Sequence, residues 1–126
     1  MEILKRYPVL DTDDVETEAA FWAAVLGGTA QPDFQSAAGD WRTIVVDGQE
    51  VLGIQLAPDH IRPQWPDGPQ RQQMHLDLYI SDLEAAHAEL MELGAQLLQA
   101  SEDPTTGHGF QVYADPAGHP FCLCWD

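Results

Sequence analysis

Basic residues are scarce in this chain, and their scarcity argues against several kinds of partner. The 126 residues include five Lys and Arg against 21 Asp and Glu, which gives a formal net charge of −16. Because affinity for nucleic-acid phosphates depends on Lys and Arg, we expect no DNA or RNA partner. An anionic membrane surface is disfavoured for the same reason. The acidity itself fits either plain solubility or attraction of a cationic small molecule.

Long apolar runs and a disulfide framework are also missing. No apolar run approaches the ~20 residues that cross a bilayer, and the first residues show no signal-peptide pattern. The two cysteines, Cys122 and Cys124, lie two apart on a predicted strand, near the upper limit of bridging distance. We therefore expect a cytoplasmic protein without membrane contact, not a secreted disulfide scaffold. The length suits a single domain over residues 1–126.

The chain contains an internal repeat. A segment at 7–27 in the first half resembles a segment at 75–94 in the second half. Superposing Asp14 on Asp82 brings the two segments into register. A repeat of this length indicates two copies of one structural unit, each of which needs the other to bury its open face.

The repeat also predicts four equivalent positions. Each half closes with an apolar strand pattern, at 51–56 and at 120–125, and the two patterns align within one residue. One position comes from the first strand and one from the last strand of each half. We expect these four positions, arranged around a pseudo-twofold axis, to be Tyr7, Gln55, His75 and Cys122.

Each half predicts a strand, a helix and three further strands. Asp13 or Asp14 can cap the first helix, and Ser81 or Asp82 the second. The dipeptide Asp47-Gly48 between alternating segments is a strong hairpin signal. The expected strands are 7–12, 30–35, 41–46, 50–56, 75–80, 96–100, 110–114 and 120–125, and the expected helices are 15–26 and 83–93. The first module is predicted at 1–57, a Pro-rich linker at 58–73 and the second module at 74–126.

Alternation along the strands assigns their two faces. Apolar residues at every second position should pack under the helices, and the residues between them should face a cleft. The sequence therefore predicts an α+β fold, in which two pseudo-symmetric βαβββ modules form a curved mixed sheet with a concave cleft and helices outside. The expected core residues are Leu76, Leu78, Ile80, Leu83, Leu90, Leu93, Phe121, Leu123 and Trp125, and the expected cleft residues are Gln55, His75, Asp77, Tyr79, Cys122 and Cys124.

Several motifs resemble one known family. They are Val9-Leu-Asp with the segment 21–27, then His75-Leu-Asp-Leu, and the turn Asp115-Pro-Ala-Gly before the last strand. In this order they resemble the glyoxalase-like domains of the vicinal oxygen chelate superfamily, which includes glyoxalase I, bleomycin-resistance proteins and extradiol dioxygenases. The resemblance spans nearly the whole chain and implies the same paired βαβββ fold.

The resemblance also bears on a metal. Metal-dependent members hold a divalent cation with His and Glu side chains at the four pseudo-symmetric positions. By resemblance, Tyr7 stands where a His is often found, Gln55 stands where a carboxylate is often found, and Cys122 replaces a Glu, so only His75 is retained. We therefore expect no metal cofactor and treat a divalent metal as the disfavoured alternative. Zn²⁺ on His75 and Cys122 would need Tyr7 or Gln55 as an uncommon third ligand.

The candidate site residues each have a structural alternative. His75 is either a ligand-contacting or acid–base catalytic residue or a hydrogen-bonded histidine in a packing role. Cys122 is a nucleophile only if its pKa is depressed, and an unreactive thiol is favoured. Trp41 and Trp65 either stack on a flat ligand or pack internally. The full set of predicted ligand-binding residues is Tyr7, Asp11, Trp41, Gln55, Trp65, His75, Asp77, Tyr79 and Cys122.

Three kinds of function remain in competition. The first is a metal-free protein that binds a small molecule, as the drug-sequestering resistance proteins do. The second is an enzyme of the same superfamily, a lyase, isomerase or dioxygenase that acts on a small metabolite. The third is a domain whose cleft is filled by its own side chains and that acts through protein contacts. We favour the first, leave open whether the protein is an enzyme, and expect a homodimer.

Overall fold

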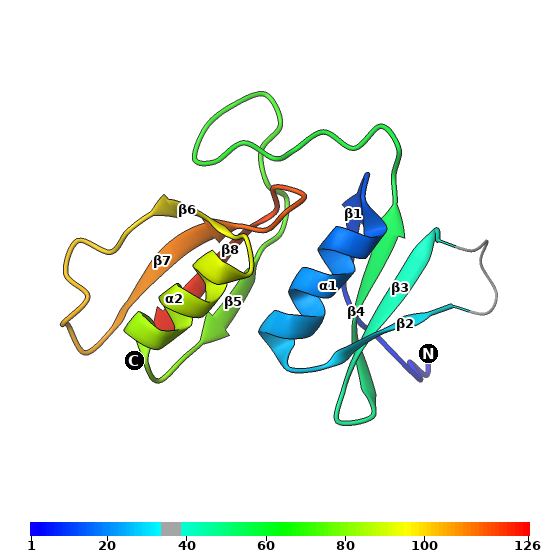
Figure 1. Ribbon diagram of the computed structural model, residues 1–126, viewed down its shortest axis with the longest axis horizontal. Coiled ribbons are helices and arrows are strands. Elements are labelled where there is room, and N and C mark those ends of the chain that lie inside the picture. Colours follow the sequence, from blue (N-terminus) through cyan, green and yellow to red (C-terminus); the bar gives the residue numbers. More distant parts are fainter. Residues whose placement is uncertain (34–38) are drawn as a thin grey trace. The chain divides into compact units, whose positions relative to one another are not determined.

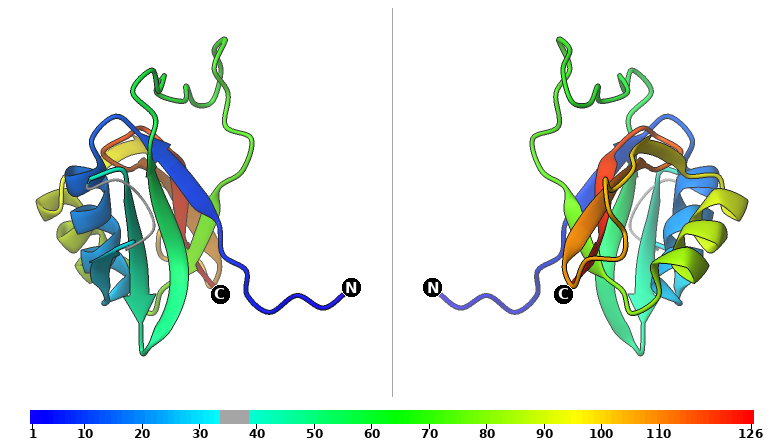
Figure 2. Two further views of the ribbon diagram at one scale, coloured as in Figure 1. Left: turned by 90° about the vertical axis from the view of Figure 1, so that its right-hand side faces the viewer. Right: turned by 90° about the vertical axis from the view of Figure 1, so that its left-hand side faces the viewer.

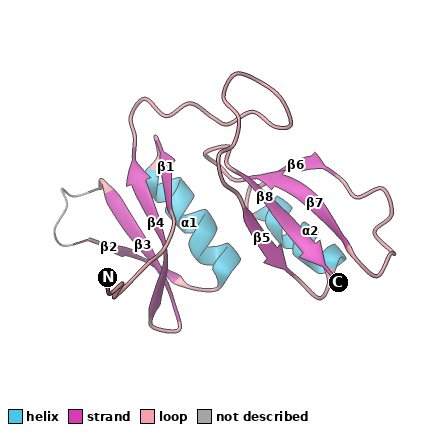
Figure 3. Cartoon of the chain, turned by 180° about the vertical axis from the view of Figure 1, so that it is seen from behind, coloured by secondary structure: helices cyan, strands magenta, loops and turns pink. Residues whose placement is uncertain are grey.

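The computed structural model describes residues 1–33 and 39–126, and divides them into two compact units, Met1–His60 and Ile61–Asp126. Each unit contains one helix and one four-stranded mixed sheet (Figure 1). The helix covers one face of the sheet of its own unit (Figures 2 and 3). The predicted α+β class and the βαβββ order of each half are confirmed.

The first unit has the strand order β1-β4-β3-β2. The edge strand β1 runs parallel to β4, and the other pairs are antiparallel. Its elements are β1 (Val9–Thr12), α1 (Val15–Leu26), β2 (Thr29–Pro32), β3 (Trp41–Val46) and β4 (Gln49–Leu56).

The second unit repeats this topology with the order β5-β8-β7-β6. Here β5 runs parallel to β8, and the remaining pairs are antiparallel. Its elements are β5 (Leu76–Tyr79), α2 (Leu83–Glu92), β6 (Gln96–Gln99), β7 (Gly109–Ala114) and β8 (Pro120–Trp125).

The local signals explain where the elements begin and end. The Asp14 carboxylate accepts hydrogen bonds from the Thr17 backbone N–H at 3.1 Å and from its hydroxyl at 2.7 Å. Asp82 accepts from the backbone N–H of Ala85 at 3.0 Å, so each helix has an aspartate N-cap. The turn between β3 and β4 holds Asp47 and Gly48 at φ 49° and 77°, as the hairpin signal predicts.

The two helices contribute unequally to the cores of their units. In the first unit, Ile44, Leu52 and Ile54 are no more than 1% exposed, and Phe21 and Trp22 of α1 are also buried. In α2 only Leu90 is buried. The expectation that Leu83 and Leu93 are buried with it is wrong, because both are half-buried.

A few expectations need further comment. The strand expected near 30–35 begins at Thr29 and ends at Pro32, while residues 34 and 35 lie outside the described residues. Phe121 and Leu123 are buried as expected. Leu76, Leu78 and Ile80 are half-buried, and so is Trp125. Within the described part of the chain, the structure contains no helix that is both long and apolar enough to cross a membrane.

Candidate functional site

A pocket of about 520 Å³ opens on one face of the second unit's sheet. All five residues that alternation assigned to this face in the second half line it. Parallel pairing of β5 with β8 sets Asp77 beside Cys122 and Tyr79 beside Cys124, which explains why the five gather. The face assignment is therefore confirmed for His75, Asp77, Tyr79, Cys122 and Cys124.

The apolar wall of this pocket comes from β7 and from the segment before β5. Trp65 packs against the buried cluster Val112, Cys122 and Cys124, which accounts for the large apolar side chain in that segment. Phe110 and Val112 were not among the predicted site residues, although β7 pairs Phe110 with Cys124 and Val112 with Cys122. Extending the alternation to β7 would have found both residues. The other lining residues are Gln72, His108, Gly109, Pro120, Trp125 and Asp126.

Trp125 was expected in the core, and that expectation is wrong. It is half-buried at the end of β8 and borders the pocket. Its indole N–H donates to the Thr106 carbonyl at 3.0 Å. A Cβ at Gly109 would lie 2.4 Å from its ring, so the glycine makes room for the indole.

His75, Asp77 and Cys122 form a polar cluster in the pocket. His75 Nε2 lies 3.3 Å from Asp77 Oδ1, and the two side chains are 43% and 47% exposed. The negative charge of Asp77 also acts on the Cys122 thiol. One nitrogen, one oxygen and one sulfur from the three residues all lie within 4.8 Å of one another. Asp77 thus lies close enough to His75 and Cys122 to orient both side chains.

The Cys122 thiol is protonated at neutral pH. Burial, followed by the negative charge of Asp77 and of Cys124, raises its pKa to about 12. Burial and the charges of Asp77 and Asp126 also raise the pKa of Cys124. Since the thiolate is the nucleophile, these shifts favour the interpretation of Cys122 as an unreactive thiol.

The pocket is acidic and aromatic. Asp77 and Asp126 line it, and among the described residues no Lys or Arg does. The second unit's two arginines bind elsewhere: Arg62 donates to the Pro116 carbonyl, and Arg71 donates to the Gly68 carbonyl at 3.4 Å. The carboxylates of the pocket therefore have no guanidinium or ammonium partner in this unit.

The candidates of the first unit lie in a row on its sheet. Asp11 pairs with Gln55 across β1 and β4, and Gln55 pairs with Trp41 across β4 and β3. The Trp41 indole donates to the Thr43 hydroxyl at 2.8 Å. Tyr7 precedes β1, and its ring centroid lies 5.5 Å from the Lys5 ammonium.

The strand register corrects one equivalence within the repeat. Superposing Asp14 on Asp82 matches Val9 with Asp77, and these pair with Gly53 and Cys122 respectively. The counterpart of Cys122 is therefore Gly53, and matching Gln55 with Cys122 is wrong by two residues. Gln55 corresponds to Cys124 instead.

Gly53 leaves no room for a metal ligand at that position. A Cβ there would lie 2.6 Å from the Trp41 ring. The equivalent positions are thus Tyr7, Gly53, His75 and Cys122, which together offer one imidazole, no carboxylate and one position without a side chain. This donor set does not fit a hard divalent ion.

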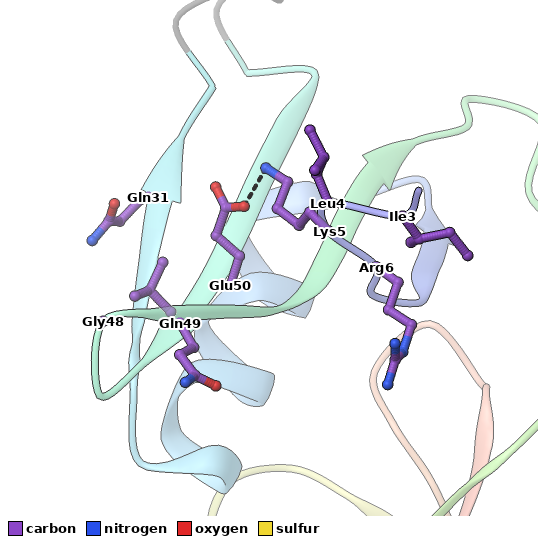
Figure 4. Close-up of a pocket in the computed structure, with 9 residues that line it drawn as sticks. Ile3, Leu4, Lys5, Arg6, Gln31, Gly48, Gln49 and Glu50 are labelled. Carbon is purple, nitrogen blue, oxygen red and sulfur yellow. Dashed lines mark ion pairs between the residues drawn. The ribbon is translucent and has the colours of Figure 1, made fainter. Parts of the chain in front are cut away.

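Two other pockets contain none of the predicted site residues in the described chain. One, of about 680 Å³, lies in the first unit between residues 3–6 and the turn after β3 (Figure 4). Lys5 forms an ion pair there with Glu50, and this hydrogen-bonded contact raises the Lys5 pKa. The other, also about 680 Å³, lies beside α2.

His87 borders the pocket beside α2 and has a structural role. Its Nδ1 lies 2.9 Å from the hydroxyl oxygen of the buried Tyr113. That hydroxyl oxygen also accepts from Gln111 Nε2 at 2.8 Å, and Gln111 Oε1 accepts from the Ser101 N–H at 3.0 Å. This chain of hydrogen bonds satisfies the polar groups buried under α2.

Similar proteins share both the sequence pattern and the fold. A family model for the glyoxalase-like domain matches residues 8–124. The uncharacterized protein YaeR of Escherichia coli K12 is 28% identical over 113 residues, which cover 87% of this chain and 86% of YaeR.

Solved structures give the same picture. The fosfomycin resistance protein FosX from Listeria monocytogenes matches with a TM-score of 0.72 at 14% identity, over 100% of this chain and 93% of FosX. A glyoxalase-related enzyme from Fulvimarina pelagi matches with a TM-score of 0.66 at 20% identity, over 98% and 89%. Because the family model covers nearly the whole sequence, the chain belongs to the glyoxalase-like domain family of the vicinal oxygen chelate superfamily.

Proposed function

We propose that this protein binds a small organic molecule in the pocket of the second unit, with His75 and Asp77 as its polar contacts. The observation that carries the proposal is the convergence of these two half-exposed groups in a pocket of about 520 Å³ with apolar walls. Small-molecule sites commonly measure ~300–1,000 Å³ and combine apolar walls with a few polar groups. Tyr79, Trp65 and Cys122 supply contact surface in the same pocket.

Binding through these groups does not require a resident metal. One structure of a Listeria FosX variant is a complex with Mn(II) and a dihydroxypropylphosphonic acid. In this chain the equivalent positions include Gly53, which lacks a side chain, and Cys122, whose thiol is protonated. We therefore propose a metal-free site for the organic ligand.

A second candidate function is a metal-dependent lyase, isomerase or dioxygenase, with His75 as a metal ligand. One observation favours it: Asp77 provides a third donor beside His75 and Cys122, a role that sequence analysis had left to Tyr7 or Gln55. An imidazole, a carboxylate and a thiolate suit Zn²⁺. Metal analysis of the purified protein separates this candidate from the first.

The other predicted ligand contacts, the oligomeric state and the cellular location are also proposals. The sequence also predicts four ligand contacts in the first unit, namely Tyr7, Asp11, Trp41 and Gln55. They stay predictions, because the pocket of the proposed function lies in the second unit.

A homodimer is proposed because each sheet presents two edge strands, whose backbone groups gain from being covered. Two free thiols fit a reducing compartment, which supports the cytoplasm as the proposed location.

The test measures ligand that accompanies the purified protein. Native mass spectrometry of the wild type should reveal a small organic adduct, and His75→Ala should retain much less of it. His60→Ala is the matched control, because it removes an imidazole that does not line the pocket. Equal adduct occupancy in all three proteins would contradict the proposal.

A further inference from the structure

We infer that the ligand of this pocket is an organic cation with a flat apolar body. The inference rests on the proposed function and names its ligand class. Three observations converge on it: the carboxylate Asp77 beside the pocket floor, two exposed aromatic rings beyond it, and the lack of Lys or Arg among the described lining residues.

The strand register fixes how these groups are arranged. One row across the sheet is Tyr79, Cys124 and Phe110, and the neighbouring row on the same face is Asp77, Cys122 and Val112. Rows on one face repeat every second residue, so they are about 7 Å apart along the strands. The carboxylate therefore stands one row away from the pair of rings.

The aromatic row has the form of an open clamp. Tyr79 and Phe110 lie on β5 and β7, with the small side chain of Cys124 on β8 between them. Strands two apart are separated by about 10 Å, which leaves room for one flat molecule between two rings. Tyr79 and Phe110 are 67% and 51% exposed, so a ligand can reach their side chains. Trp65 adds a third aromatic surface at the same pocket.

The charged residues around the pocket favour a positively charged ligand. Asp77 has one oxygen near His75 and stays half-exposed, and Asp126 lines the same pocket. Arg62 and Arg71 donate to carbonyls outside it. A positive group placed next to Asp77 gains an ion pair, and its flat body gains cation–π contact with the rings. An anion such as a phosphonate would instead face two carboxylates.

The experiment compares three probes with one ring system and different charges. They are N-methylquinolinium (a cation), quinoline (neutral at pH 7.5) and quinoline-8-sulfonate (an anion), each titrated into the intact protein by calorimetry. We expect the cation to bind at least tenfold more tightly than either of the others. Tyr79→Ala and Phe110→Ala should weaken the cation and quinoline together, whereas Met91→Ala, which removes an exposed apolar side chain on α2, should weaken neither.

Two variants distinguish the effect of the Asp77 charge in the pocket from the effect of the protein's net charge. Asp77→Asn should lower the affinity for the cation to that for quinoline, so that the preference for the cation is lost. Glu92→Gln removes one negative charge from an exposed position on α2, and this variant should keep the preference for the cation. Loss of the preference in both variants, or in neither, would overturn the inference.

The outcomes also distinguish this inference from the proposed function. If quinoline binds in the pocket as tightly as the cation, the cation inference fails while small-molecule binding stands. If none of the three probes binds, both fail.

Discussion

At the scale of single residues, Tyr113 shows how the second unit tolerates polar groups in its core. Its hydroxyl oxygen accepts from the Gln111 amide at 2.8 Å and forms a second hydrogen bond, at 2.9 Å, with His87 Nδ1. The histidine is held by the core and is not available to the pocket around His75.

Tyr113→Phe should therefore destabilise the protein by about 1–3 kcal/mol, because a buried amide donor and His87 lose their partner. The measurement is urea unfolding followed by circular dichroism. Tyr79→Phe is the matched control, since Tyr79 is 67% exposed, and it should change the free energy of unfolding by less than about 0.5 kcal/mol. Equal effects in the two variants would show that the buried hydroxyl contributes nothing.

The stability difference between the wild type and Tyr113→Phe should depend on pH. Burial raises the Tyr113 pKa, so the unfolded chain loses this proton first, near about pH 10. The stabilisation is fully present below the unfolded pKa and is lost as pH rises through the folded pKa. The stability difference between wild type and Tyr113→Phe should shrink as the pH rises above about 10, and a constant difference would contradict the shift.

At the scale of elements, the structure shows which of the two predicted residues, Ser81 or Asp82, is the N-cap of α2. The carboxylate of Asp82, not the Ser81 hydroxyl, accepts the Ala85 N–H at 3.0 Å. Asp82→Ala should destabilise the protein by about 0.5–2 kcal/mol in urea unfolding, because an amide at the helix start loses its acceptor. Ser81→Ala should have little effect. A larger loss in Ser81→Ala would reverse the assignment.

Sequence predicted the elements well because their signals are local. The aspartate caps and Asp47-Gly48 place both helices and the first hairpin within a few residues. Parallel register has no comparable local signal, because the two strands are joined through a helix and two other strands. The expected match of Gln55 with Cys122 did not anticipate this register, in which Gly53 takes that place. The apolar patterns at 51–56 and 120–125 would by themselves have set Gln55 opposite Cys124.

The candidate site was predictable only where alternation applied. His75, Asp77 and Cys122 follow from the period of two along β5 and β8. Trp65 lies in an irregular segment, and the contact that places it in the pocket is a long-range one. Asp77 as a partner of both His75 and Cys122 depends on pairing across strands, which a single strand does not reveal.

At the scale of the whole molecule, the metal content follows from the donor set. Gly53 and the protonated Cys122 do not provide ligands for a hard ion, so the purified, dialysed protein should hold well under one equivalent of transition metal. Elemental analysis by mass spectrometry measures this. Stoichiometric Zn, Ni, Mn or Fe that is lost in His75→Ala would instead support the metal-dependent candidate.

The assembly state is the second prediction at this scale. We expect a homodimer with twofold symmetry, measured by sedimentation in moderate salt at high micromolar concentration. Moderate salt matters because two chains of formal net charge −16 repel each other, and low salt screens this repulsion least. A monomer under these conditions would contradict the proposal.

The most direct test of the central claim is an NMR titration of the intact protein with small organic probes, including the quinoline series. The proposed function predicts shifts that cluster in the segments 75–79, 108–112 and 122–126, which carry most of the residues that line the pocket. It also predicts that His75→Ala weakens binding by roughly tenfold, about 1.4 kcal/mol, while the remaining spectrum keeps its dispersion. Shifts confined to other surfaces, or undiminished binding in His75→Ala, would contradict the claim.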